Sequence, residues 1–128
     1  MLEGSCLCGG IRYVIDGELG PIIHCHCGQC RKASGASFAT NAPVDADRFR
    51  FVSGEELLGQ FESSPGQFRC FCTRCGSPLI KRMAAKPDVV RLRLGTLDSD
   101  PGGKPIGHFL LQWKAPWTDL DDGLPQHG

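Results

Sequence analysis

The stretch His24-Cys25-His26-Cys27-Gly28-Gln29-Cys30-Arg31-Lys32 places three cysteines in a Cys-x-Cys-x2-Cys pattern. Three thiolates at this spacing can converge on one metal ion with little reorganisation of the chain, and zinc is the usual ion in sulfur-rich tetrahedral sites. Cys25, Cys27 and Cys30 supply three ligands, and no fourth is obvious nearby. A metal site with three protein ligands keeps a position open for water or substrate, which is the arrangement of catalytic zinc.

Two further cysteine clusters lie on either side of this stretch. Cys6 and Cys8 come from one tight turn near the N-terminus, and Cys72-x2-Cys75 forms a knuckle that is followed by Gly76. Together these four cysteines have the ligand count of a closed structural zinc site. The sequence therefore predicts two zinc ions per chain, one structural and one catalytic, with the structural ion joining the N-terminus to a distant hairpin.

One cysteine and three histidines are left without an assigned role. Cys70 can be a buried small hydrophobe, a fourth ligand of the three-cysteine site or a redox-active thiol, and burial is favoured because free cysteines are usually buried. Alternation along an extended segment turns His24 and His26 away from a metal held by Cys25 and Cys27. His108 lies in an apolar segment typical of a core strand. Any of these histidines can carry protons near neutral pH.

Composition limits the kinds of protein that this chain can be. Its 128 residues suit one domain, and 14 basic side chains balance 14 acidic ones. A net charge of zero disfavours nucleic acid as a partner, and the longest apolar runs are too short for a membrane span. The N-terminus shows no export signal, and eight cysteines at metal spacing favour a reducing, cytoplasmic location. We expect one zinc domain over residues 1–117 and a loosely held tail over residues 118–128.

Short alternating segments between Gly and Pro turns predict an all-β domain with at most one short helix. The helix is expected directly after Cys27 and to end near Ser34. Trp113 and Trp117 can mark a subunit contact or belong to the domain's own core, and the core is favoured. The predicted strands cover residues 11–15, 49–52, 57–61, 67–71, 89–94 and 108–113.

The ordered motifs resemble a known family. Those that carry the resemblance are Gly4-Ser5-Cys6-x-Cys8-Gly9, Cys25-His26-Cys27-x2-Cys30-Arg31-Lys32-x2-Gly35, Phe71-Cys72-x2-Cys75-Gly76-Ser77-Pro78-Leu79, His108 and Lys114-Ala115-Pro116-Trp117. They are similar to the motifs of the glutathione-dependent formaldehyde-activating enzymes, a family that includes the centromere protein V type. The resemblance implies an Mss4-like fold of folded β-sheets (a β-tent) around zinc. It also implies a structural four-cysteine site and a catalytic three-cysteine site.

The function implied by this resemblance is that of a carbon–sulfur lyase. Glutathione, as co-substrate, and formaldehyde would interconvert with S-hydroxymethylglutathione, and the partners would be a small thiol and a small aldehyde. Arg31 and Lys32 are candidates for binding the carboxylates of the thiol, although a solvated basic pair explains them equally well. The alternative function is a zinc-stabilised binding or scaffold module without catalysis, which is favoured if Cys70 or a histidine closes the second site. The oligomeric state stays open.

Overall fold

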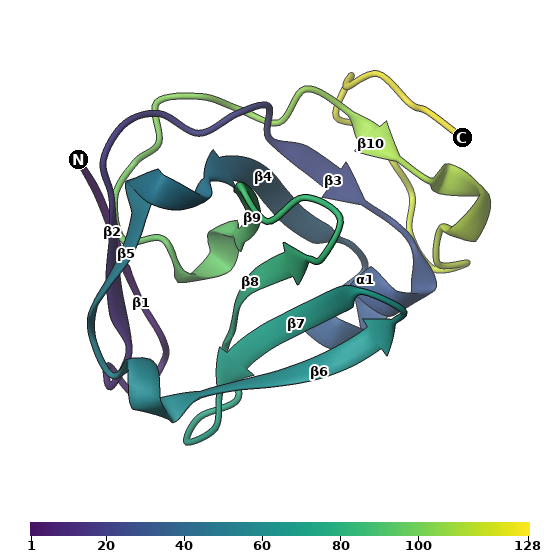
Figure 1. Ribbon diagram of the computed structural model, residues 1–128. Helices are drawn as coiled ribbons and strands as arrows, with labels where there is room; N and C mark the ends of the chain where they lie inside the picture. Colours follow the sequence, from purple (N-terminus) through teal and green to yellow (C-terminus); the bar gives the residue numbers. More distant parts are fainter.

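The computed structural model describes residues 1–128 as two β-sheets with one short helix, which confirms the all-β prediction (Figure 1). The small antiparallel sheet has the order β1 (Leu2–Ser5), β2 (Arg12–Ile15), β5 (Phe49–Ser53). The large sheet has the order β10 (His108–Phe109), β3 (Ile23–Cys25), β4 (Ala39–Asp45), β9 (Val89–Arg93), β8 (Pro78–Met83), β7 (Gln67–Cys72), β6 (Leu58–Ser64). Its strands pair antiparallel except β10 and β3, which are parallel. The helix α1 spans Gly28–Ser34, and single 3-10 turns are η1 (Ala46–Arg48), η2 (Glu55–Leu57), η3 (Leu94–Thr96) and η4 (Leu111–Trp113).

Most of the predicted elements are present, and the last strand is shorter than predicted. Helix α1 begins directly after Cys27 and ends at Ser34, as expected. β10 stops after Phe109 because Leu110 has a φ of 58°, a left-handed conformation that no strand accommodates. The chain then turns into η4, which contains Trp113.

Strand β4 was not predicted, because Asn41 and Pro43 are poor strand formers. β3 pairs only with Ala39–Asn41 of β4, so Pro43 lies beyond the end of β3. At that point the Pro43 carbonyl accepts a hydrogen bond from the Gly20 amide instead of from a strand. A proline is tolerated there because β4 is locally an edge strand.

The hydrophobic core lies between the two sheets. Alternate residues of β2, β7 and β9 point into it, and β8 contributes two consecutive residues where its register with β7 shifts. The cluster consists of Cys6, Ile11, Tyr13, Ile15, Val44, Cys70, Cys72, Leu79, Ile80, Val90 and Leu92. The expectation that the tryptophans belong to this core is wrong. Trp113 is 58% exposed and Trp117 is 68% exposed, because both follow the end of β10 and lie outside the sheets.

The C-terminal residues return to the edge of the large sheet beside β10, as the yellow end of the chain shows (Figure 1). His108 donates its backbone N–H to Pro125, and His127 donates its own to His108. Leu111 also donates its backbone N–H to His127. These hydrogen bonds bring residues 122–128 close to the second cysteine cluster, since β10 pairs with β3. How firmly the tail is held, and with it the division at residue 117, stays a prediction.

Candidate functional site

The first group of candidate metal ligands brings together the two sheets. Cys6 and Cys8 lie in the turn after β1, whereas Cys72 ends β7 and Cys75 lies in the turn before β8. Their four Sγ atoms lie within 4.8 Å of one another. Cys8 Sγ is 3.5 Å from Cys6 Sγ and 3.9 Å from Cys72 Sγ. This is the complete thiolate set that a closed structural zinc site needs, so the donors fit that ion.

Both turns of this group direct polar hydrogens toward sulfur. The Ile11 amide donates to Cys6 Sγ over 3.2 Å, and the Arg74 amide donates to Cys72 Sγ over 3.4 Å. The second turn closes through a hydrogen bond from the Gly76 amide to the Cys72 carbonyl, and Gly76 has a φ of +80°. A residue with a side chain rarely adopts this backbone conformation, which explains the glycine after the knuckle. A hydrogen bond with Ser77 is the main cause that lowers the pKa of Cys75, to about 5, so this ligand ionises readily.

The second group consists of Cys25, Cys27 and Cys30, whose Sγ atoms also lie within 4.8 Å of one another. Cys25 is the last residue of β3, and Cys27 is the N-cap of α1, where its sulfur accepts the Cys30 amide over 3.2 Å. Cys25 and Cys30 are buried, with their Sγ atoms 3.4 Å apart. The first turn of the helix therefore brings all three sulfurs together within six residues of the chain. The three sulfurs fit one zinc ion with a free fourth position.

Hydrogen bonds and nearby cations favour the thiolate form of Cys30 in the second group. Its pKa is lowered to about 4, mainly by the hydrogen bond with Cys25 and further by Cys27 and the nearby cations of Arg93 and Arg69. The same contact, together with burial, raises the pKa of Cys25. A thiol must lose its proton to bind metal, so Cys30 is prepared for ligation at neutral pH.

Neither Cys70 nor any histidine belongs to the second group. Cys70 is 1% exposed and packs in the core between the sheets, which agrees with the favoured assignment as a buried thiol. Burial raises its pKa, as expected for an unreactive thiol. The group thus keeps three protein ligands, and the condition under which a closed binding module would be favoured is not met.

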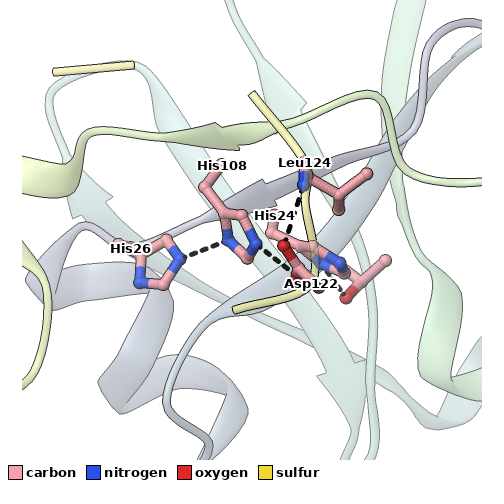
Figure 2. A network of polar contacts seen from close by, with 6 residues as sticks. His24, His26, His108, Asp122 and Leu124 are labelled. Carbon is pink, nitrogen blue, oxygen red and sulfur yellow. Dashed lines mark hydrogen bonds and ion pairs between the residues drawn. The ribbon is translucent and has the colours of Figure 1, made fainter. Parts of the chain in front are cut away.

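The histidines form a polar chain beside this group (Figure 2). His26 Nε2 and His108 Nδ1 are 2.8 Å apart, and His108 Nε2 lies 2.8 Å from the carboxylate of Asp122. His24 bonds Thr40 through its Nδ1 atom, over 2.8 Å. The hydrogen bond from His108 is the main cause that lowers the pKa of Asp122. Sequence reasoning recognised His108 as a core residue and missed Asp122, because nothing in the tail indicates that it returns to β10.

A cavity of about 590 Å³ adjoins the second group. Cys30 lines it, together with the small or apolar side chains Ala33, Ala36, Phe38 and Phe61. The guanidinium groups of Arg69 on β7 and Arg93 on β9 also line it. Sequence reasoning missed both arginines. The Arg91-Leu92-Arg93 alternation in the clearest period-two strand was the signal that could have found one of them.

Arg31 and Lys32, the sequence-based candidates for carboxylate binding, lie beside a different hollow, and their role stays a prediction. Both line a separate hollow of about 320 Å³, together with Ser37 and Trp117, and neither lines the cavity beside Cys30. The Arg31 guanidinium lies over the Trp117 ring, 6.0 Å from its centre, and the Trp117 indole donates to Ser37. The indole thus holds Arg31 on the outer side of α1.

The fold and the two cysteine groups define a class of β-protein with one closed and one open set of thiolate ligands. Comparison with known proteins shows which family within this class the chain belongs to. The chain belongs to the glutathione-dependent formaldehyde-activating enzyme family, whose sequence profile matches residues 1–112. The match includes all seven cysteines of the two groups.

Individual relatives agree with this assignment. A protein of Halomonas elongata, provisionally named a glutathione-dependent formaldehyde-activating enzyme, is 35% identical over 130 aligned residues, covering 94% of this chain and 82% of the relative. A protein of Schizosaccharomyces pombe described as an uncharacterized lyase is 32% identical over 77 residues, and the alignment covers 60% of this chain and 54% of the relative. The crystal structure of a Rhodobacter sphaeroides protein superposes with a TM-score of 0.66 at 21% identity, covering 80% of this chain and 96% of that one. This last likeness concerns the fold alone. No helix of the chain has the length and apolarity needed to cross a membrane.

Proposed function

We propose that this chain is a carbon–sulfur lyase that joins a glutathione-like thiol to a small aldehyde such as formaldehyde and releases them again. The observation that carries the proposal is the group of Cys25, Cys27 and Cys30, which lacks a fourth protein ligand and whose Cys30 lines a cavity. Membership of a formaldehyde-activating family and the lyase name of one relative support an enzyme of this kind. The cytoplasmic location expected from the sequence stays a prediction.

The two cysteine groups would hold one zinc ion each. Cys6, Cys8, Cys72 and Cys75 would hold the structural ion, and Cys25, Cys27 and Cys30 would hold the other. Zinc bound to three thiolates supplies an open coordination position at which the pKa of a thiol falls, which makes the thiol nucleophilic at neutral pH.

The proposed reaction needs no oxidant or reductant. The sulfur of the thiol forms a bond to the carbonyl carbon, the carbonyl π bond breaks, and the proton that leaves sulfur ends on the new hydroxyl oxygen. The product is an S-hydroxymethyl adduct when the aldehyde is formaldehyde, and the reverse step releases both reactants. The residues of the chain would bind the thiol in the cavity beside Cys30. Phe38 and Phe61, on the cavity wall, would keep water from the reacting atoms.

Magnetisation-exchange NMR tests this proposal. With ¹³C-formaldehyde and glutathione in solution, the wild-type protein is expected to accelerate exchange between free formaldehyde and the S-hydroxymethyl adduct. Cys27→Ser should abolish the acceleration while preserving the helix, since serine is a good N-cap. Cys70→Ser is the matched control and should keep the acceleration, because Cys70 belongs to neither group and, although it borders the cavity, is only 1% exposed. Equal exchange rates with wild type, with Cys27→Ser and without protein would contradict a lyase function.

A further inference from the structure

Four cations lie on one face of the large sheet, beside the second cysteine group. In the strand register, Arg69 of β7 is directly opposite Lys81 of β8, and Lys81 is directly opposite Arg91 of β9. Arg93 follows two residues along β9, so its side chain projects from the same face as that of Arg91. We call these four side chains the cationic row. The opposite face of the same strands carries the apolar core.

No carboxylate neutralises the cationic row. The only ion pair in the structure joins His108 and Asp122. The oxygen atoms that bond the row are neutral: Arg91 Nε donates to Asn41 Oδ1 over 2.8 Å, and Arg69 donates to Ser63 Oγ over 3.1 Å and to Gln29 Oε1 over 3.4 Å. Burial lowers the pKa of Lys81, and the neighbouring Arg69 and Arg93 cations lower it further. The row therefore holds like charges close together, and the only anionic groups near it are the thiolates of the second cysteine group.

Arg93 shows most clearly that a partner is missing. It is 8% exposed, and its Nη2 atom is buried without a hydrogen-bond partner, although the residue lines the cavity beside Cys30. A buried charged donor without a partner is strongly unfavourable, so a ligand that supplies an acceptor at this atom would relieve that cost. The guanidinium is thus available to an anion that enters the cavity.

The cysteine group does not supply enough negative charge to balance the row. Three thiolates and one divalent ion have a formal charge of −1, against +4 for the four side chains, which leaves +3. Only one sulfur contact with the row is within hydrogen-bonding range, that of Arg69 Nη2 with Cys30 Sγ at 3.9 Å. Arg69 and Arg93 line the cavity, and Lys81 and Arg91, which do not, extend the row along the same face of the sheet.

We propose that the cationic row binds the carboxylates of the glutathione-like thiol of the proposed function. The inference rests on the proposed function, because it takes the sulfur of the ligand to be the reacting atom. Neighbouring strands are about 4.8 Å apart, so the row crosses roughly 10 Å from β7 to β9. That span suits two separated carboxylates better than one compact anion. Arginine forks bind carboxylates with two parallel hydrogen bonds, and Arg69 contacts Cys30, so a carboxylate held there brings the thiol to the cysteine group.

Isothermal titration calorimetry of the full metal-replete chain tests the proposal. The ligand is S-methylglutathione, which keeps both carboxylates and whose methylated sulfur has no proton to lose. Arg69→Gln and Lys81→Gln are each expected to weaken its affinity about tenfold, the usual value of a hydrogen bond to a charged group. Arg82→Gln is the matched control. It removes the same charge one residue along β8, but Arg82 projects from the opposite face and pairs with Phe68 and Val90, so affinity should be unchanged.

The outcomes separate this proposal from the proposed function. If Arg82→Gln weakens binding as much as Lys81→Gln, or if neither row variant changes the affinity by more than twofold, the cationic row is not the binding site. Loss of affinity in Arg31→Gln alone would overturn it in favour of the hollow beside Trp117. If S-methylglutathione binds through the row but the protein does not accelerate adduct exchange, the row stands and the lyase function fails. Buried Arg93 is left unchanged in these variants because its replacement can disturb folding.

Discussion

Replacing both Cys72 and Cys75 with serine is expected to destabilise the protein far more than replacing Cys27 with serine. Both changes disable a group of metal ligands, but the two groups close very different lengths of chain. Cys8 and Cys72, in the first group, are separated by 64 positions and belong to different sheets. Cys25 and Cys30, in the second, are separated by 5.

The size of the difference follows from loop-closure entropy. If each metal-bridged group is treated as a cross-link, the 64-residue loop contributes about 4 kcal/mol to the free energy of unfolding at 25 °C, and the 5-residue loop about 2 kcal/mol. For 128 residues, the entropy of unfolding is about 0.27 kcal/mol/K. The Tm is therefore expected to fall by about 15 °C in the Cys72→Ser/Cys75→Ser variant and by about 7 °C in Cys27→Ser.

Thermal unfolding followed by circular dichroism gives both values, and elemental mass spectrometry gives the zinc content of the same samples. We expect close to two zinc ions per wild-type chain and close to one in each variant. Cys70→Ser controls for the loss of a buried thiol and should keep both ions, even if the hydroxyl lowers its Tm. A larger fall in Tm for Cys27→Ser than for the double variant would refute the assignment of the structural group.

Three other predictions concern the frame around the site. Gly54→Ala should lower the free energy of unfolding by more than about 2 kcal/mol in urea titrations. Gly54 has a φ of +78°, and a Cβ there would lie 2.0 Å from a backbone oxygen. Gly66→Ala should cost only about 1 kcal/mol, because Gly66 has a similar φ of +76° but its nearest neighbour would be 3.5 Å away. Burial raises the pKa of Tyr13 from 10 to about 12, so the unfolded chain loses this proton first, and stability should fall by up to roughly 3 kcal/mol between pH 10 and 12. Tyr13→Phe should remove that pH dependence, and a wild-type slope in Tyr13→Phe would contradict the assignment. The lowered pKa of Asp122 contributes stability that is present above its ordinary pKa of 3.8 and lost as the pH falls below that value. Asp122→Asn should remove this pH dependence and speed hydrogen exchange in residues 122–128. Unchanged exchange in this variant would show that the tail is held without the Asp122 carboxylate.

Residue patterns alone were enough to predict the all-β class, the short helix after Cys27 and the division of seven cysteines into groups of four and three. These features are local or rest on ligand counting. Spacing within Cys25-x-Cys27-x2-Cys30 sets which sulfurs can meet across one helical turn, and alternation predicts a strand without knowledge of its partners. The four-cysteine group joins distant positions, but its membership follows because a closed site needs four ligands.

The side chains that surround the second cysteine group are known only from the way the strands pair and the chain returns. Arg69, Lys81 and Arg91 face one another because β7, β8 and β9 pair in one register, and a shift by one residue would turn any of them into the core. Asp122 reaches His108 only because the chain returns to the edge of β10, and Arg31 is turned away from the cavity because it lies on the outer side of α1 with Trp117. Such contacts depend on strand register and chain return over tens of residues. Neither leaves a periodic signal in the sequence, so the chemical surroundings of the candidate site could not be predicted from it.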